Sequence, residues 1–278
     1  MRWYDVKIML KKTVLALIPL ILVMSAAAQD ASPPVSYQTA LIPREYSLNV
    51  YDENGWYGSP IIDVLQNGMP VEITRPGRLP NNELWVPISY DDGKSGWVPR
   101  QFIIGNIDPE AFCSDARVTE LIEVLKEAVR NRDSAQLAEV VSPRGLYLAQ
   151  HSDERQFLPP EVVATFFEDT LPRRWQRHDI GRDIFITESL AVEVTDKLQR
   201  DLLADDITTT CNLNQDGLSD QTSLYAARLP GYEANNFYAI KRPGPPGFEL
   251  DWGAWGIVIE YWDDEPVILA LGYYVWFP

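Results

Sequence analysis

The chain has 278 residues, with 40 acidic and 24 basic side chains and a formal net charge of −16 at pH 7. A field of this sign keeps a protein soluble and repels polyanions. It therefore excludes nucleic acid, teichoic-acid-like polymers and anionic lipid headgroups as favoured partners, because phosphate binding depends on clusters of Lys and Arg.

The first 28 residues have the three parts of a secretory signal peptide. Residues 1–12 carry four basic residues and one acid, residues 13–24 are uncharged and apolar, and Ala26-Ala27-Ala28 offers a small-residue cleavage site. The apolar stretch is shorter than the roughly 20 residues that span a bilayer. We expect cleavage after Ala28, no stable membrane span afterwards, and an extracytoplasmic (periplasmic or secreted) location. The remaining 250 residues hold 20 basic and 39 acidic side chains, a net charge of −19.

Residues 29–35 form a polar, proline-containing leader that we expect to be disordered. Short alternating apolar runs, broken by Gly, Asn, Asp and Pro, then continue to about residue 106. The runs are Leu48–Tyr51, Ile61–Leu65, Val71–Ile73, Trp85–Ile88 and Trp97-Val98. This pattern predicts a mainly β domain, a small barrel over residues 36–106.

The ordered set of Leu48-Asn49-Val50, two glycines, Val71-Glu72-Ile73, Trp85 and residues 92–98 (DGKSGWV) resembles the bacterial SH3 (SH3b) family. The resemblance implies an SH3-like barrel in the cell envelope that binds wall peptides or a protein partner. Tyr51 stands where the family commonly has Arg, so the family's ligand preference does not transfer to this position.

Aromatic side chains in the turns and strand starts are the candidate ligand-binding residues, because they give contact area at low entropic cost. They are Tyr51, Trp56, Tyr57, Trp85 and Trp97. Trp85 and Trp97 fit a half-buried scaffold equally well, since Trp is often mostly buried. Trp56 and Tyr57 lie in a polar turn and are the better exposed candidates.

Residues 107–278 predict an α+β domain in which helices precede an antiparallel sheet. The sequence predicts four helices in this domain. The first begins after Ser114 as N-cap, the second at Asp133 or Ser134 and the third at Pro159-Pro160, and the fourth covers residues 190–203. Strands follow at residues 237–240, 255–262 and 267–277. The last two are apolar on nearly every residue, which predicts a central hairpin covered on both faces. A helix cradled by a curved sheet, as in cystatin-like folds, is the preferred arrangement. Residues 235–278 also resemble the end of uncharacterised bacterial envelope proteins, which implies no activity.

The two cysteines, Cys113 and Cys211, predict one disulfide in an oxidising compartment. Closing a loop of about 100 residues would stabilise the fold by up to roughly 4–5 kcal/mol. The alternative is two free, buried thiols.

Three constellations suggest chemistry, and each has a structural alternative. Cys113-Ser114 with His178 resembles papain-like wall endopeptidases, but Asp115 replaces their Gly, and His178 lies in a charged stretch without a strand pattern. Glu249 and Asp251, with Glu260 among tryptophans, suggest glycoside hydrolysis, yet neighbours on one strand point the same way and cannot flank a sugar.

The third constellation is a calcium loop with four candidate ligands, Asn212, Asn214, Asp216 and Asp220. Ser223 replaces the bidentate Glu at its twelfth position, so an ordinary turn explains the same residues. His151 and His178 form no zinc set, and no cofactor motif occurs, so we expect no metal and no cofactor.

These observations predict a secreted, non-catalytic binding or interaction protein of the cell envelope. The alternative is a cell-wall hydrolase whose catalytic domain lies unrecognised in residues 107–278.

Overall fold

The computed structural model describes residues 33–42, 45–52, 57–79, 83–150, 155–179, 182–212, 235–248 and 251–275. Within these residues the protein is mainly β, with a seven-stranded sheet, a six-stranded sheet and a two-stranded ribbon. The predicted signal peptide (1–28) and most of the leader lie outside the described residues; Val35, at the end of the leader, packs partly buried against the core. From Pro33 onward the chain forms one compact unit. No helix among the described residues is long and apolar enough to cross a membrane.

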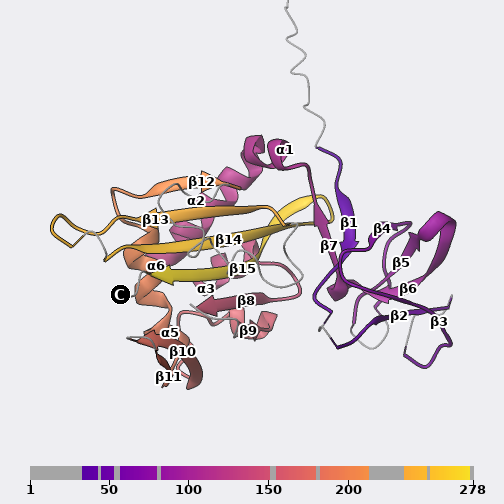
Figure 1. Ribbon diagram of the computed structural model, residues 1–278, viewed down its shortest axis with the longest axis horizontal. Coiled ribbons are helices and arrows are strands. Elements are labelled where there is room, and N and C mark those ends of the chain that lie inside the picture. The colour runs from indigo at the N-terminus through magenta and orange to yellow at the C-terminus, as the bar shows by residue number, and fades with distance from the viewer. Residues whose placement is uncertain are drawn as a thin grey trace, which may run out of the picture. The chain divides into compact units, whose positions relative to one another are not determined.

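The first sheet has the strand order β3-β2-β6-β5-β4-β1-β7, and all its pairings are antiparallel (Figure 1). Its strands are β1 (Ser36–Thr39), β2 (Leu48–Tyr51), β3 (Ile61–Leu65), β4 (Pro70–Ile73), β5 (Trp85–Tyr90), β6 (Lys94–Pro99) and β7 (Ile103–Asn106). Alternate residues such as Leu48 and Val50 fill its core together with Val86, Ile88 and Val98. Every run that the sequence pattern predicted as a strand here is one.

The second sheet has the order β12-β13-β14-β15-β8-β9. Its strands are β8 (Leu146–Gln150), β9 (Arg155–Leu158), β12 (Thr208–Cys211), β13 (Phe237–Arg242), β14 (Gly253–Trp262) and β15 (Glu265–Val275). The hairpin of β14 and β15 is central, as predicted, and it turns at Asp263-Asp264, which both have positive φ. The predicted strands of this sheet, β13, β14 and β15, pair antiparallel as expected, whereas β8 and β9 were not predicted and β8 joins the sheet by pairing with β15 in parallel.

Six helices are described: α1 (Pro109–Ser114), α2 (Ala116–Asn131), α3 (Ser134–Val140), α4 (Pro160–Val163), α5 (Leu190–Glu193) and α6 (Thr195–Leu202). Asp115, not Ser114, caps α2, and its carboxylate accepts the backbone N–H of Arg117 at 3.0 Å. Ser114 instead donates to the Glu110 carbonyl within α1. The single helix predicted over 190–203 is two short helices, which meet at Val194.

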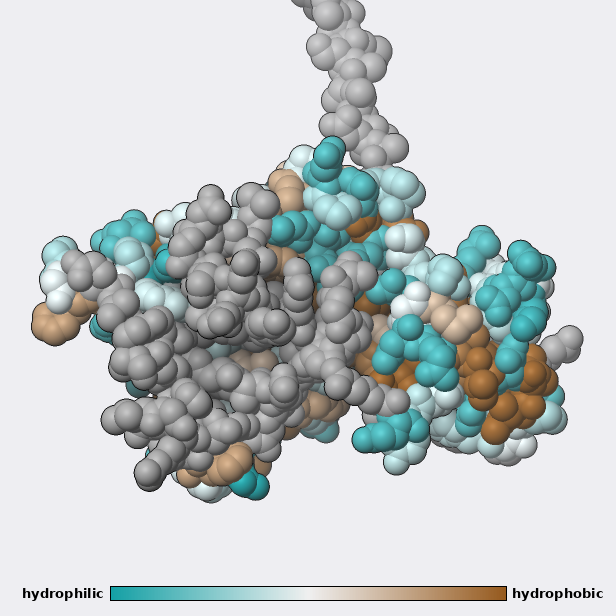
Figure 2. All heavy atoms as spheres, in the orientation of Figure 1, coloured by the Kyte–Doolittle hydropathy of each residue, from teal (hydrophilic) through white to brown (hydrophobic). Residues whose placement is uncertain are grey.

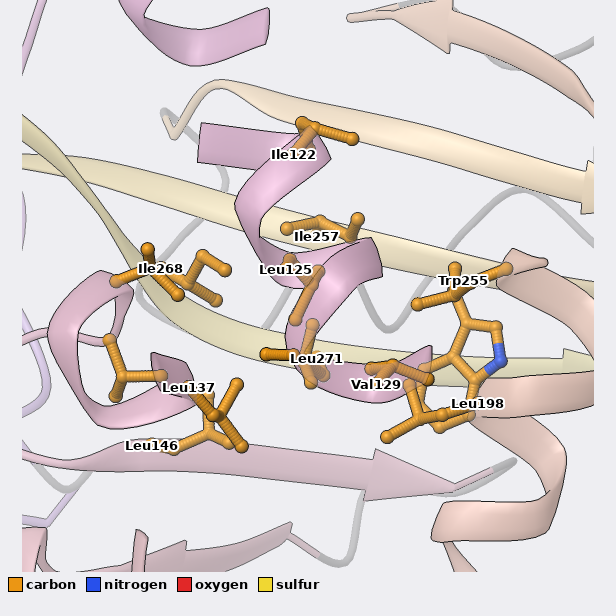
Figure 3. Close-up of a cluster of buried hydrophobic side chains, with 14 of the residues drawn as sticks. Ile122, Leu125, Val129, Leu137, Leu146, Leu198, Trp255, Ile257, Ile268 and Leu271 are labelled. Atoms are coloured by element: carbon orange, nitrogen blue, oxygen red, sulfur yellow. The ribbon is translucent and has the colours of Figure 1, made fainter. Parts of the chain in front are cut away.

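Helices pack on one face of the hairpin, residues from the edge of the first sheet pack on part of the other, and β14 is buried along nearly its whole length. Figure 3 shows Leu125 and Val129 of α2 packed towards Ile257 and Leu271. On the opposite face, Ala40 and Ile104 from the first sheet belong to a buried cluster with Val258, Leu269 and Ala270 of the hairpin. The prediction that both faces are covered is therefore confirmed.

A buried ion pair lies where the two sheets meet. The Glu260 carboxylate on β14 accepts hydrogen bonds from Arg144 Nη2 at 2.6 Å and from Ser142 Oγ at 2.6 Å. Arg144 also donates to the carbonyls of Gln101 and Ile103, next to β7. Arg100 stacks 3.9 Å from the centre of the Trp262 ring, and burial, followed by the nearby charge of Arg144, lowers its pKa to about 10.

A two-stranded ribbon, β10 (Arg173–Asp179) with β11 (Arg182–Glu188), corrects another prediction. The charged stretch around His178 has no apolar alternation, yet it forms a strand because β11 pairs along its whole length. Trp175 anchors it: the ring is buried and its Nε1 donates to the Glu188 carbonyl at 2.8 Å.

Cys113 of α1 and Cys211 of β12 form a disulfide, with Cα atoms 5.7 Å apart. The predicted pairing is confirmed, and the bond closes a loop of 98 residues that lies wholly after the seven-stranded sheet. It ties the first helix of this part of the chain to the edge strand of the six-stranded sheet. A disulfide fits an oxidising compartment.

Candidate functional site

Four of the five predicted aromatic residues, Tyr51, Tyr57, Trp85 and Trp97, lie together at the seven-stranded sheet. The ring centres of Tyr51 and Trp85 are 5.2 Å apart, those of Tyr57 and Trp85 are 4.9 Å apart, and both pairs meet edge to face. Trp97 on β6 pairs directly with Tyr51 on β2 and joins the same buried cluster. Trp56 lies outside the described residues.

Burial divides these aromatic side chains into scaffold and surface. Trp85 and Trp97 are almost completely buried and Tyr51 is 6% exposed, whereas Tyr57 is 60% exposed. The buried rings fit the scaffold interpretation and fix the orientation of the Tyr57 ring, which faces solvent.

A hollow of about 250 Å³ opens beside Tyr57. We call it the aromatic hollow; its lining residues are Ile42, Tyr46, Ser47, Leu48, Asn49, Tyr51, Tyr57, Pro99 and Phe102. Tyr46 is 66% exposed and extends the aromatic surface of the hollow. Sequence reasoning missed Tyr46 and Phe102; the one available signal was the position of Tyr46, two residues before the first β strand of the family-like pattern.

Glu83 fixes the rim of the aromatic hollow. Its carboxylate accepts hydrogen bonds from the Tyr57 hydroxyl at 2.9 Å, from Trp85 Nε1 at 3.2 Å and from Gln101 Nε2 at 3.2 Å. Partial burial and the bond to Glu83 raise the pKa of Tyr57 to about 12. The phenol is therefore neutral at physiological pH and is held in place before any ligand arrives.

A second hollow, of about 570 Å³, lies beside Trp97. This Trp97 hollow is lined by Asp52, Ile62, Thr74, Arg75, Pro87, Ile88, Ser95, Gly96 and Trp97. The guanidinium carbons of Arg75 and Arg78 lie 5.1 Å and 5.0 Å from the centre of the Trp97 ring. Neither arginine was a candidate in the sequence, because nothing in their spacing indicated that both would meet one ring.

The structure gives the catalytic candidates that it describes other roles or exposed positions. Cys113 is in the disulfide and has no thiolate to offer as a nucleophile. Glu260 is fully buried in its ion pair with Arg144, and the Asp251 side chain is 68% exposed. Glu249 and His151 lie outside the described residues.

Among the described residues, no three His, Cys, Asp or Glu side chains gather as a metal site. Of the predicted calcium ligands, only Asn212 is described. Its side-chain oxygen accepts the backbone N–H of Phe237 at 2.9 Å, and its amide donates to Asn236 at 2.7 Å. Asn214, Asp216 and Asp220 lie outside the described residues.

Sequence reasoning also missed a buried ionic cluster under α6. Asp201 is fully buried and accepts hydrogen bonds from Arg242 Nε at 2.6 Å and Arg200 Nε at 2.8 Å. Gly253 lies so close that a Cβ there would be 2.5 Å from the Asp201 carboxylate. Burial and the charge of Asp201 raise the pKa of Tyr273, whose hydroxyl accepts from Arg200. This cluster joins α6 to the sheet.

No model of a protein family matches the chain, and neither a curated protein nor a solved structure matches it.

Proposed function

We propose that this is an extracytoplasmic, non-catalytic binding protein, whose seven-stranded sheet is an SH3-like barrel that takes a short peptide segment in the aromatic hollow. The segment belongs to the cell wall or to an envelope protein. The observation that carries the proposal is an exposed pair of tyrosines, Tyr46 and Tyr57, on a rim that the buried Trp85 and Glu83 fix in place.

The size of the aromatic hollow favours a peptide side chain over a larger ligand. Its volume of about 250 Å³ is below the roughly 300–1,000 Å³ of sites that enclose a drug-sized molecule. Tyrosine rings bind such segments with apolar area and a polar hydroxyl, and they lose little rotamer entropy. The bond of Tyr57 to Glu83 lowers that cost further, because the ring is ordered before binding.

Three features support the envelope as the place of action. The N-terminal 28 residues have signal-peptide architecture, the cysteines are paired, and residues 48–98 resemble the SH3b family. Because the mature chain is strongly acidic, we expect its wall ligand to be the peptide part and not an anionic polymer.

The test is co-sedimentation of residues 29–278 with purified peptidoglycan sacculi, followed by titration with soluble stem peptides. We expect Tyr46→Ala and Tyr57→Ala each to weaken binding at least tenfold, since each removes one wall of the hollow. Phe248→Ala is the matched control, because Phe248 is an equally exposed aromatic residue (73%) outside the hollow.

Binding that survives both tyrosine variants would refute the aromatic hollow as the site. Release of muropeptides or glycan fragments from the sacculi during the assay would instead favour the hydrolase alternative. A photo-crosslinker at position 46 that captures the same envelope protein only when Glu83 is intact would identify a protein partner in place of the wall.

A further inference from the structure

We infer that the Trp97 hollow is a second binding site, which takes the free carboxylate end of a peptide with a small apolar last residue. The site is separate from the aromatic hollow and does not depend on what fills it. The cavity has an apolar wall and an arginine in its lining, with a second arginine on the same Trp97 ring; neither forms an ion pair within the described part of the chain, although the protein's overall charge is strongly negative.

The cationic pair is Arg75 and Arg78. Because both guanidinium carbons lie about 5 Å from the Trp97 ring centre, they are no more than about 10 Å from each other. Among the described residues neither forms an ion pair, whereas Lys94, Arg117, Arg144 and other surface or buried cations do. Of the two, Arg75 lines the hollow, so an anion that enters it meets the Arg75 guanidinium, and Arg78 on the same ring adds a second positive charge nearby.

Guanidinium groups select carboxylates by geometry as well as by charge. Each presents N–H donors in a planar fork that matches the two oxygens of a carboxylate. Arg75 and the exposed residue Ser95 both line the hollow, and the Ser95 hydroxyl is a further hydrogen-bond donor there. The stacking of both guanidiniums on Trp97 limits their rotamers, which reduces the entropy lost when they bind.

The apolar part of the lining favours an apolar ligand side chain next to the carboxylate. Ile62, Pro87, Ile88 and the edge of Trp97 form an apolar wall, and Ile62 is 51% exposed on the edge strand β3. Figure 2 shows hydrophobic residues gathered in the region where Figure 1 draws β3, whose Ile61, Ile62 and Val64 are exposed. An apolar side chain next to the carboxylate would cover Ile62 and remove this area from water.

The volume of the Trp97 hollow and the negative charge of Asp52 in its lining restrict the size and charge of the ligand. The volume of about 570 Å³ lies within the roughly 300–1,000 Å³ of small-ligand sites, which suits two peptide residues. Asp52 lines the same hollow, so a second negative charge on the ligand would meet a carboxylate. A ligand with one carboxylate at its end can pair with Arg75 without this repulsion.

The experiment is isothermal titration of residues 29–278 with four probes: N-acetyl-Gly-Ala, its C-terminal amide, N-acetyl-Gly-Glu-amide and inorganic phosphate. We expect N-acetyl-Gly-Ala to bind at least tenfold more tightly than the other three. Equal binding of the acid and its amide would overturn the inference. Equal binding of phosphate would do the same, since it would show an unselective anion site, and preference for the Glu probe would overturn the assignment to a chain end.

Single substitutions test whether N-acetyl-Gly-Ala binds in the Trp97 hollow. Arg75→Gln should weaken N-acetyl-Gly-Ala at least tenfold, and Arg75→Lys should restore only part of the loss because Lys lacks the fork. Arg174→Gln is the matched control: its guanidinium also stacks on an aromatic ring, 3.6 Å from the centre of Phe185, but on the distant ribbon. Tyr46→Ala should leave this binding unchanged, which separates the result from that of the aromatic hollow.

Discussion

The buried pair of Arg144 and Glu260 makes a quantitative prediction about the contact between the two sheets. The side chains are 3% and 0% exposed, and their closest N–O distance is 2.6 Å. Replacing Arg144 with Met leaves the Glu260 carboxylate buried with Ser142 as its remaining hydrogen-bond donor among the described residues. Removing one partner of a buried pair costs about 3–5 kcal/mol, because the other charge stays buried without compensation.

The same variant also removes the donors to two backbone carbonyls. Arg144 donates to Gln101 and Ile103 on the side of the first sheet, so the loss falls on both sheets together. Glu260→Gln should cost less, about 1.5–3 kcal/mol, since the amide oxygen still accepts a hydrogen bond from Arg144. A double variant, Arg144→Met with Glu260→Leu, should recover part of the loss, because neither member of the pair is then left as a buried charge without its partner.

Urea unfolding of residues 29–278 measures these differences in the free energy of unfolding, and thermal unfolding measures the matching change in Tm. For a chain of this size 1 kcal/mol corresponds to about 2–4 °C, so Arg144→Met should lower Tm by about 6–20 °C. Arg130→Met is the control: Arg130 pairs with Glu127 on the exposed side of α2, where such pairs contribute at most about 1 kcal/mol. A loss below 1 kcal/mol for Arg144→Met, or strict additivity in the double variant, would refute this account of the contact.

Three further predictions concern single features of the fold. Gly105→Ala should destabilise by about 1–3 kcal/mol in urea unfolding, because its Cβ would lie 2.3 Å from a backbone carbonyl of β14. Reducing the Cys113–Cys211 bond should cost up to roughly 4–5 kcal/mol, seen as a lower Tm with dithiothreitol than without. Tyr57 should ionise at about pH 12 by ultraviolet absorbance, and Glu83→Gln should lower that midpoint. Because folding raises this pKa, the associated stability is complete below about pH 10 and lost as the pH rises towards 12.

The sequence predicts the terminal hairpin well because its signals are local and agree with one another. Both arms are apolar at nearly every position, which only a strand buried on both faces tolerates. The turn residues Asp263-Asp264 adopt the positive φ values that a two-residue hairpin turn requires. Its central place in the sheet follows from the same burial.

The parallel pairing and the ribbon were not predictable, because their causes are not local. β8 pairs with β15 across more than a hundred residues, as in the register of Leu148 with Leu271, and a short strand with four apolar residues does not encode a partner. β10 is charged and becomes a strand through its pairing with β11. Tertiary pairing overrides local preference in both cases.

For the candidate site, the sequence identified residue types but not their surroundings. It selected Tyr51, Tyr57 and Trp85, which lie together, and it named Tyr57 as the better exposed ring, but it left the scaffold and ligand-binding interpretations of Trp85 equally open and did not predict the burial of Tyr51. Tyr46 and Arg75 reach the hollows from loops and strand ends, whose positions depend on how the sheet closes. Composition alone gave no reason to choose them among the other tyrosines and arginines.

The overall charge and the Trp97 hollow together define which anions the protein can accept. At physiological ionic strength charges are screened beyond about 8 Å, so Arg75 and Arg78 act only on groups that enter the hollow. A polyanion approaches the acidic surface with many charges at once, and most of them remain outside the hollow facing carboxylates. A peptide with a single terminal carboxylate places its only charge at the arginines and its apolar side chain on Ile62. We therefore expect the Trp97 hollow, with two arginines that form no ion pair among the described residues, to favour a singly charged peptide end over a polymer of phosphates.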